Sequence, residues 1–250
     1  YFDIGDFCLE DSYISVIEAI KHAAWDQETK PIIKWIDSKV FEKDASKLDE
    51  LKKVDALIVP GGFGESGVEG KILAIKYARE NKLPYLGLCY GMQLAVVEFA
   101  RNVCGMNGAN TTEINRNTKY PVIDILPEQK KKLEEKNFGA SMRLGAYKAK
   151  LKKGTIVHGL YGQEIISERH RHRWEVNKEF ISRLEQKGLI VSGVNPEKNL
   201  VEFIELPKEK HPYFVATQAH PEFQSKFVKP APLFTGLIKA AIKQQSSRIK

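Results

Sequence analysis

The chain has 250 residues, of which 42% are hydrophobic and 28% are charged, which is ordinary for a globular protein and enough for one well-cored α/β domain. No apolar run is long enough to suggest a membrane-spanning helix, so we expect no membrane partner. The formal net charge of +7 comes mostly from dispersed lysines without a nucleic-acid-binding signature, so we expect no nucleic-acid partner either.

Strand-like and helical patterns alternate along the first part of the chain. In order, we predict a strand within 1–10, a helix beginning at Asp11, a strand over 31–37, a short helix over 45–51, a strand over 56–59, a helix over 69–80, a strand over 84–88 and a helix over 91–102. Such alternation predicts a parallel sheet with helices on both faces. Ligands of such sheets bind at the carboxyl ends of the strands.

The character of the sequence changes after Gly105. Residues 106–140 are polar and rich in lysine, and we expect long loops with a short strand near 122–126 and either a mobile stretch or a solvated helix over 128–139. Short strand-like runs then predict β-rich additions around the edge of the sheet, at 165–166, 189–192 and 200–205. A last apolar run covers 213–215, and a last helix covers 233–242. Because no linker composition interrupts the chain, we expect residues 1–250 to form one domain.

The chain begins Tyr1-Phe2-Asp3-Ile4, without the basic segment of a signal peptide. It also lacks an initial Met and starts in a strand-like run, so we interpret the sequence as an excised piece of a longer protein. Three cysteines, Cys8, Cys89 and Cys104, cannot all pair in disulfides, which fits a reducing compartment. We therefore expect a cytoplasmic protein.

Cys89 occupies the junction between the predicted strand over 84–88 and the helix that follows. Gly87 and Gly91 flank it, which gives the G-x-C-x-G form of a nucleophile elbow. The N-terminus of the following helix points its free N–H groups toward the sulfur and favours the reactive thiolate. In the alternative interpretation, Cys89 is a small buried hydrophobe, the commoner fate of a free cysteine.

Two further stretches could complete a catalytic site. His220-Pro221-Glu222 offers a base and a carboxylate that orients it, although the pair could also be a surface histidine beside a solvated acid. Gly61-Gly62 follows the strand over 56–59 and could present a backbone N–H to a developing oxyanion. A phosphate-binding loop is the competing interpretation of Gly61-Gly62, but neither of the usual phosphate-binding glycine patterns is present.

Together, Pro60-Gly-Gly-Phe-Gly, Gly87-Leu-Cys-Tyr-Gly-Met-Gln and His220-Pro-Glu resemble the motifs of the class I (triad) glutamine amidotransferases. Four longer segments resemble the CTP synthase family in particular, at 11–22, 92–102, 141–145 and 168–177. The resemblance covers only the glutaminase half of that enzyme. It implies a flavodoxin-like α/β fold with a central, mostly parallel sheet, helices on both faces and added short strands.

The resemblance also implies residue roles. Cys89 matches the nucleophile, His220 the general base and acid, and Glu222 the orienting carboxylate. The elements that bind glutamine and the oxyanion match Gly62, Tyr90, Gly91, Met92 and Gln93. Glu113 and Arg173 match the residues that hold the α-amino and α-carboxylate groups of glutamine. The chain departs from the family at Gly5-Asp6-Phe7, where Gly-Lys-Tyr is usual, and at Tyr90, where the family more often has Leu.

By resemblance, the full enzyme is a ligase that uses ATP and Mg²⁺ to activate UTP and adds ammonia channelled from glutamine to give CTP. GTP activates the glutaminase step, and the enzyme is typically a homotetramer. We expect the synthetase half to lie outside this sequence and this domain to need neither a cofactor nor a metal. Two alternatives remain open on the sequence, namely the glutaminase of another triad amidotransferase and a basic binding module in which Cys89 is incidental.

Overall fold

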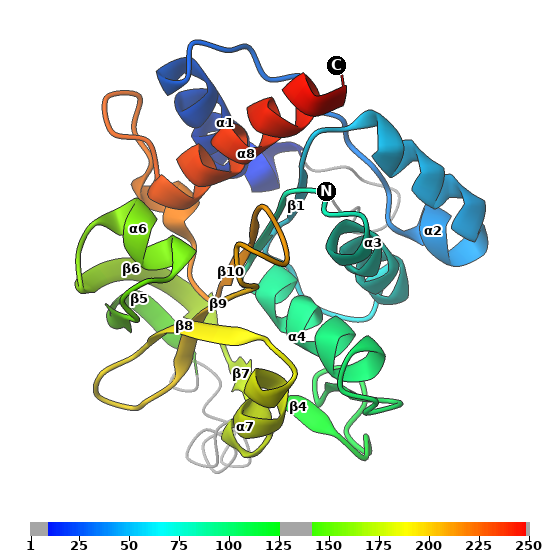
Figure 1. The fold of residues 1–250 in the computed structure, drawn as a ribbon. Coiled ribbons are helices and arrows are strands. Elements are labelled where there is room, and N and C mark those ends of the chain that lie inside the picture. The colour runs from blue at the N-terminus through cyan, green and yellow to red at the C-terminus, as the bar shows by residue number, and fades with distance from the viewer. Residues whose placement is uncertain (1–9, 126–141, 249–250) are drawn as a thin grey trace.

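The fold is built on one seven-stranded sheet. The computed structural model describes residues 10–125 and 142–248 (Figure 1), so most of the strand predicted within 1–10 and all of the stretch 128–139 lie outside the described residues. The strands of the sheet, in spatial order, are β1 (Leu57–Val59), β2 (Tyr85–Leu88), β10 (Phe214–Thr217), β9 (Val201–Glu205), β8 (Ile190–Val194), β5 (Arg143–Leu151) and β6 (Ile165–His172).

The sheet has a parallel part and an antiparallel part. Strands β1, β2 and β10 pair parallel to one another, whereas β9, β8, β5 and β6 are joined by antiparallel pairing. The α/β fold with added strands is confirmed, but the sheet as a whole is mixed, and its parallel character is confined to β1, β2 and β10. The reason is that β9 reaches β10 through a short connection without a crossover helix, and such a connection permits only antiparallel pairing.

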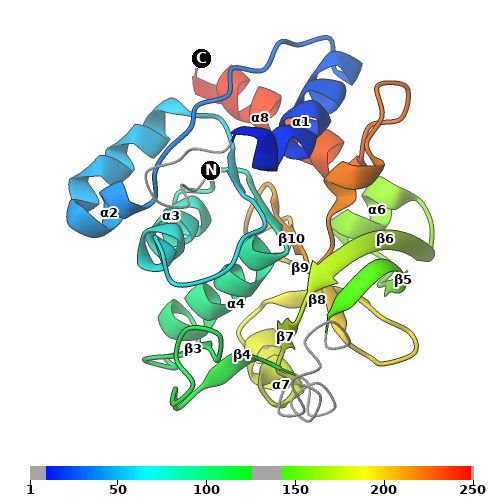
Figure 2. The same ribbon diagram turned by 180° about the vertical axis from the view of Figure 1, so that it is seen from behind.

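Helices cover both faces of the parallel part (Figures 1 and 2). Helices α1 (Ile14–Asp26) and α8 (Pro232–Arg248) lie together on one face, and α3 (Val68–Glu80) and α4 (Tyr90–Asn102) lie on the other. Successive residues of β2 serve the two faces, since Tyr85 packs in the cluster of α3 and α4 and Leu86 packs in that of α1 and α8. None of the described helices is both long and apolar enough to cross a membrane.

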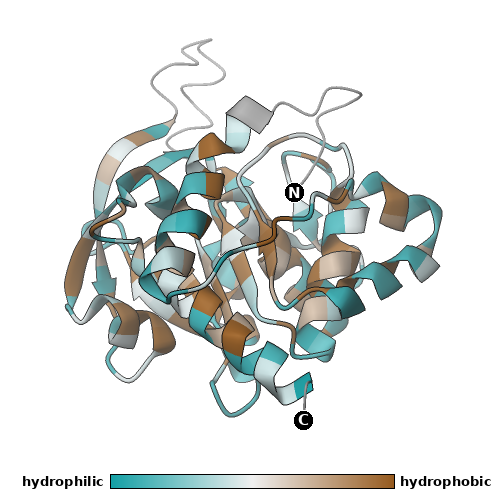
Figure 3. Ribbon diagram, turned by 90° about the horizontal axis from the view of Figure 1, so that it is seen from above, coloured by the Kyte–Doolittle hydropathy of each residue, from teal (hydrophilic) through white to brown (hydrophobic). Residues whose placement is uncertain are grey.

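The hydropathy of the chain follows these layers. Figure 3 shows apolar residues concentrated on the strands between the helices, whereas the helices themselves are two-coloured. Strands β2 and β10 are buried along their whole length, as expected for strands covered on both faces. This apolar centre fixes the ends of β1, β2 and β10, where the candidate site lies.

The structure corrects several element predictions. Residues 31–37 form no strand, because this apolar run lies extended without a ladder partner among the described residues. The predicted helix over 45–51 is a 3-10 helix, Ala45–Lys53, and on α3 only Ile72 of the three expected inward residues is fully buried, while Leu73 and Tyr77 are half-buried. Three short α-helices were not predicted, namely α2 (Lys39–Lys43), α6 (Ile156–Tyr161) and α7 (Lys178–Gln186), nor was the 3-10 helix Pro221–Gln224.

A second, small sheet lies beside α4. Its order is β3 (Asn110–Thr111), β4 (Pro121–Ile125) and β7 (Trp174–Val176), so the strand predicted near 122–126 is confirmed as β4. Glu113 follows β3 closely, and Arg173 directly precedes β7. The small sheet therefore brings two segments distant in sequence to the same side of α4.

Candidate active site

The predicted elbow is present at the end of β2. Cys89 separates β2 from α4 and adopts φ 49° and ψ −100°, a conformation that non-glycine residues rarely hold. Its N–H donates to the carbonyl of Thr217 on β10 at 2.7 Å, and its own carbonyl accepts from the N–H of Met92 at 3.0 Å. Strand pairing on one side and the first turn of the helix on the other thus hold the cysteine in this geometry.

The two glycines of the elbow are required by close contacts. A Cβ on Gly91 would collide with the carbonyl oxygen of Val59 on β1. A Cβ on Gly87 would lie 2.7 Å from the hydroxyl of Tyr85 and 2.9 Å from the Cβ of Ala216. The helix can therefore start directly above the sheet only with glycine at these positions.

His220 and Glu222 meet at the elbow. His220 Nδ1 lies 2.7 Å from Glu222 Oε1, and the side chains are only 12% and 3% exposed. Burial disfavours the charged imidazole, but hydrogen bonds to Cys89 and to Glu222 outweigh it and raise the pKa of His220 to about 10. The imidazole also packs on the glycine loop, since a Cβ on Gly61 would lie 2.7 Å from its Cε1 atom.

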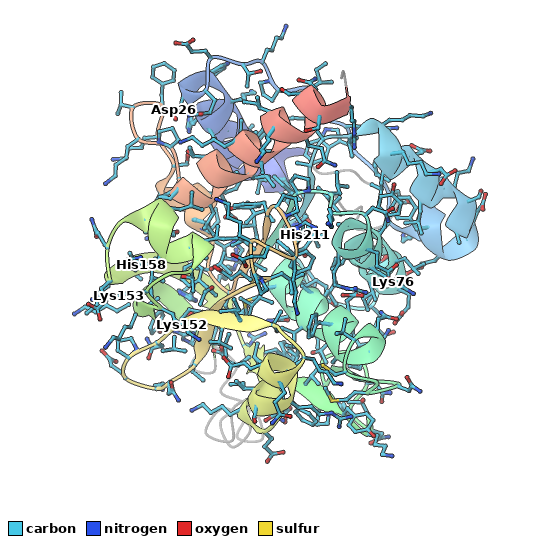
Figure 4. The ribbon with its side chains drawn as sticks, viewed as in Figure 1. Asp26, Lys76, Lys152, Lys153, His158 and His211 are labelled. Carbon is cyan, nitrogen blue, oxygen red and sulfur yellow. The ribbon has the colours of Figure 1, made fainter. Side chains whose placement is uncertain are left out.

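No other described histidine is placed to serve Cys89. His211, labelled in Figure 4, is buried and shares a hydrogen bond of 3.0 Å between its Nε2 and the carbonyl of Ala78. His158 lies near Lys152 and Lys153, on the α6 side of the molecule (Figure 4). The remaining histidines, His22, His170 and His172, hydrogen-bond to Ser225, to each other or to a backbone carbonyl.

Gly64 and Glu113 come together in the loop that joins β1 to α3, residues 60–67, which we call the glycine loop. Gly64 has a φ of +76° and donates its N–H to a carboxylate oxygen of Glu113 at 3.0 Å. Burial raises the pKa of Glu113, while the Gly64 N–H and the charge of Arg173 oppose that rise. The other residue predicted to bind the substrate's α-groups, Arg173, thus acts electrostatically on Glu113.

Tyr90 and Gly62 are also adjacent. The Tyr90 hydroxyl donates to the carbonyl of Gly64 at 2.6 Å, and a Cβ on Gly62 would lie 3.5 Å from the Tyr90 ring. The backbone N–H of Tyr90 belongs to the first turn of α4, directly after Cys89. The two backbone segments expected to stabilise an oxyanion therefore lie next to each other.

Met92 and Gln93 point away from open space. Met92 is fully buried in the apolar cluster of α3 and α4, so only its backbone is available to a substrate. Gln93 is 3% exposed, and its side-chain N–H group donates to the carbonyl of Trp174 at 2.9 Å and lies 3.4 Å from Oε1 of Gln218. In this structure, the amide of Gln93 therefore connects α4 to β7 and to Gln218.

Gln218 is a site residue that the sequence analysis missed. Its side-chain amide donates to Cys89 Sγ at 3.6 Å, and Sγ lies 3.9 Å from the carbonyl oxygen of Arg171 on β6. A signal was available, because Gln218 precedes His220 by two residues and a period of two places side chains on the same side of an extended chain. Among the described residues, no group of three or more His, Cys, Asp or Glu side chains is arranged to hold a metal ion.

Comparisons with known proteins agree with this geometry. The family model described as "Glutamine amidotransferase class-I" matches residues 8–240. The CTP synthase of Methanocaldococcus jannaschii is 54% identical over 239 residues, which are 94% of this chain and 43% of that protein. The CTP synthase of Pyrococcus furiosus is 53% identical over 234 residues, 93% of this chain and 42% of that protein. The chain thus spans less than half the length of these relatives.

Solved structures give the same assignment. The glutaminase domain of Trypanosoma brucei CTPS, determined with bound acivicin, superimposes with a TM-score of 0.89 at 35% identity and covers 97% of this chain and 92% of that one. A GMP synthase protein from Thermoplasma acidophilum shares the fold alone, with a TM-score of 0.60 at 14% identity over 100% of this chain and 96% of that one. The chain therefore belongs to the class-I glutamine amidotransferase family and, within it, to the glutaminase domains of CTP synthases.

Proposed function

We propose that this chain hydrolyses L-glutamine through a Cys89–His220–Glu222 triad and a γ-glutamyl thioester. The observation that carries the proposal is the buried contact of 2.7 Å between His220 and Glu222, beside Cys89, which is held on a strained elbow and helps to raise the pKa of His220. Strained backbone clusters at functional sites, and a nucleophile, a base and an orienting acid in this order are the parts of a covalent acyl-transfer site.

In the first half of the reaction, the Cys89 thiolate attacks the side-chain amide carbon of glutamine. A sulfur–carbon bond forms, and the carbonyl electron pair moves to oxygen, where the backbone N–H groups of Gly62 and Tyr90 stabilise the negative charge. Because its pKa is raised to about 10, His220 is protonated near neutral pH and can give its proton to the leaving nitrogen. The carbon–nitrogen bond then breaks, which releases ammonia and leaves the thioester.

In the second half, water attacks the thioester carbon. The neutral His220 left by the first half accepts a proton from that water, and the thiolate leaves as the carbon–sulfur bond breaks. Glu222 holds His220 through Nδ1, so that Nε2 is the nitrogen directed at the reacting atoms. The products are glutamate and the regenerated cysteine.

Recognition of the non-reacting end of glutamine falls to Glu113 and Arg173. A carboxylate suits the α-ammonium group, and the planar guanidinium fork suits the α-carboxylate. Glu113 is partly buried beside the glycine loop, and the charge of Arg173 acts on it. Their separation in sequence is bridged by the small sheet, which places the segments after β3 and before β7 next to α4.

We further propose that the ammonia serves the amination of UTP to CTP in a synthetase half that is not part of this sequence. The support is the likeness to CTP synthases, of which the chain spans 43% and 42% in the two relatives above. In that assembly, ATP and Mg²⁺ would act in the synthetase half, GTP would activate the glutaminase step and four copies would associate in a cytoplasmic enzyme. We assign no residue of this chain to ATP, UTP, GTP or Mg²⁺.

The test is covalent labelling with acivicin, the compound bound in the Trypanosoma brucei domain. Its electrophilic carbon should be attacked by the nucleophile with loss of chloride, so peptide mass spectrometry should find one adduct, on Cys89. L-glutamine should protect Cys89, whereas L-asparagine, one methylene shorter, should not. Cys104 is the internal control, since it is a free and buried thiol just beyond the far end of α4. Labelling confined to Cys8 or Cys104 would refute the assignment of Cys89.

A further inference from the structure

The side chain of Tyr90 connects the two parts of the candidate oxyanion site. Its backbone N–H stands directly after the nucleophile, and its hydroxyl reaches the glycine loop and donates to the carbonyl of Gly64 at 2.6 Å. The tyrosine is 2% exposed. Burial, followed by the charges of Glu113 and Glu65, raises the pKa of Tyr90, so the hydroxyl stays protonated and can act only as a neutral donor to the carbonyl.

Gly64 is held from both sides. Its N–H donates to Glu113 at 3.0 Å, while its carbonyl accepts from Tyr90, so the peptide groups before and after Gly64 each have one fixed partner. A φ of +76° is accessible to glycine without strain, and a Cβ there would meet nothing within 4 Å. Glycine is therefore required by the backbone conformation, and the two hydrogen bonds select one orientation in a segment that could otherwise adopt several.

Lys71 on α3 contributes a third contact to the same loop. Its ammonium group donates to the carbonyl of Ser66 at 3.3 Å and lies 5.5 Å from the centroid of the Tyr90 ring. This geometry adds a cation–π contact that favours one position of the ring. The ring position in turn directs the hydroxyl at Gly64.

We propose that Tyr90 is a positioning residue, and that its hydroxyl, together with Glu113, fixes the glycine loop in the orientation that presents the Gly62 N–H to the oxyanion. This inference rests on the proposed glutaminase function and adds a side-chain role to a residue otherwise assigned only a backbone one. Glu113 touches both the loop and, in the proposed function, the α-ammonium group of glutamine. Substrate binding and loop orientation therefore share one carboxylate.

The test compares Tyr90→Phe with Tyr213→Phe in the 250-residue chain. The two tyrosines are matched, since Tyr213 is 3% exposed and its hydroxyl donates to the carbonyl of Leu233 at 2.7 Å, at the opposite end of β10 from the site. Tyr90→Phe should lower kcat for glutamine hydrolysis roughly two- to tenfold, the range expected for one hydrogen bond, with KM nearly unchanged. Tyr213→Phe should leave both constants unchanged.

Two measurements separate this role from a structural one. Alkylation of Cys89 by iodoacetamide forms no oxyanion, so its rate should be equal in wild type and Tyr90→Phe. Amide hydrogen exchange should accelerate in residues 60–67 in Tyr90→Phe but not in Tyr213→Phe. Unchanged exchange in these residues, or an equal fall of kcat in both variants, would overturn the positioning role.

The same measurements distinguish the two proposals. If the wild-type chain released no glutamate and acivicin left Cys89 unlabelled, the proposed function would fail, while faster loop exchange in Tyr90→Phe would still support the contact between Tyr90 and the loop. If glutamine were hydrolysed and Tyr90→Phe left kcat unchanged, only the positioning role would fail.

Discussion

The parallel and antiparallel parts of the main sheet bury different kinds of residue. Strands β2 and β10 are fully buried and almost entirely apolar, and they lie between two layers of helices. Strand β6 instead alternates exposed residues with buried ones, and three of its four buried residues are polar, namely Glu168, His170 and His172. The parallel part carries Cys89 at the end of β2, whereas the antiparallel part buries polar side chains on β6.

The buried charge forms one connected set, which we call the ionic cluster. Arg143 on β5 lies 2.7 Å from Glu202 on β9 and 3.3 Å from Glu175 on β7. His170 and His172 complete the set as neutral imidazoles, because burial lowers the pKa of both. Burial, opposed chiefly by Arg143, raises the pKa of Glu175 to about 8. Two backbone carbonyls of β6 face the site. The carbonyl of Arg169 accepts from the N–H of His220 at 2.7 Å, and the carbonyl oxygen of Arg171 lies 3.9 Å from Cys89 Sγ. The side chains of β6 thus join the ionic cluster, while its backbone carbonyls face His220 and Cys89.

The largest effect is expected from Cys89→Ala, which removes the thiol at the end of β2 and leaves the packing of the parallel part intact. Glutamine hydrolysis should fall by more than about a thousandfold, because loss of a covalent nucleophile removes the whole pathway. Glutamate release is the measurement, and the thermal unfolding midpoint should not fall. Turnover near the wild-type rate would remove Cys89 from the mechanism.

Arg143→Met instead removes the cation of the ionic cluster in the antiparallel part. It leaves two carboxyl groups buried without their cation and should lower the free energy of unfolding by about 3–5 kcal/mol in urea titrations. Lys150→Met on the same strand is the matched control, because the Lys150–Glu164 pair is exposed and spans 3.5 Å, and it should cost less than about 1 kcal/mol. Equal losses of unfolding free energy in the two variants would show that the ionic cluster stabilises the fold no more than an exposed ion pair does.

Arg173→Ala removes a guanidinium group directly before β7 of the small sheet. It should raise KM for glutamine roughly ten- to a hundredfold, as expected for the loss of a charged hydrogen bond of about 1.5–3 kcal/mol to a non-reacting carboxylate. Steady-state kinetics provides the check, with Arg169→Ala, an exposed arginine on β6, as the control that should bind glutamine normally. An unchanged kcat/KM in Arg173→Ala would assign that arginine another task.

The last effect is on the pH dependence of stability and concerns Lys71, a buried cation on the parallel side. Burial, partly offset by Glu42 and Asp37 and assisted by Lys39, lowers the pKa of Lys71 to about 8 from an ordinary 10.5. Between these values the unfolded chain binds one more proton than the folded chain, so the Lys71 contribution to stability should rise with pH from about 8 to 10.5. Denaturant titrations across this window should show a shallower rise in Lys71→Met, and parallel pH profiles would contradict the assignment.

The sequence was most informative where apolar pattern and glycine geometry agree. The runs over 56–59 and 84–88 and the glycines around Cys89 predicted two strands and a sharp turn, and the structure contains them with Cys89 at the turn. In the antiparallel part, the run over 165–166 marked only the first two residues of β6 and β5 was missed, because Arg143, His170 and His172 are polar residues on inward positions and break the apolar alternation. The apolar run over 31–37 failed in the opposite way, since hydrophobicity cannot supply a ladder partner.

The residues of the candidate site also differ in how well the sequence predicts them. Cys89, His220 and Glu222 could be proposed from their residue types and spacing, and the structure brings them together. Glu113 and Arg173 were found only through the family resemblance, because their proximity depends on the small sheet. The hydroxyl of Tyr90 contacts Gly64 across 26 residues, which no local pattern encodes, whereas the two-residue spacing of Gln218 from His220 was a local signal that the sequence reading did not use.

The backbone of Cys89 has a consequence for the history of the chain. Its φ of 49° with ψ of −100° carries a conformational cost on the order of 1–3 kcal/mol that glycine would not bear. If Cys89 is the nucleophile, as proposed, catalysis rather than folding accounts for a residue other than glycine at this position. A descendant freed from catalysis would be expected to drift toward glycine at position 89 and become more stable as it lost its activity.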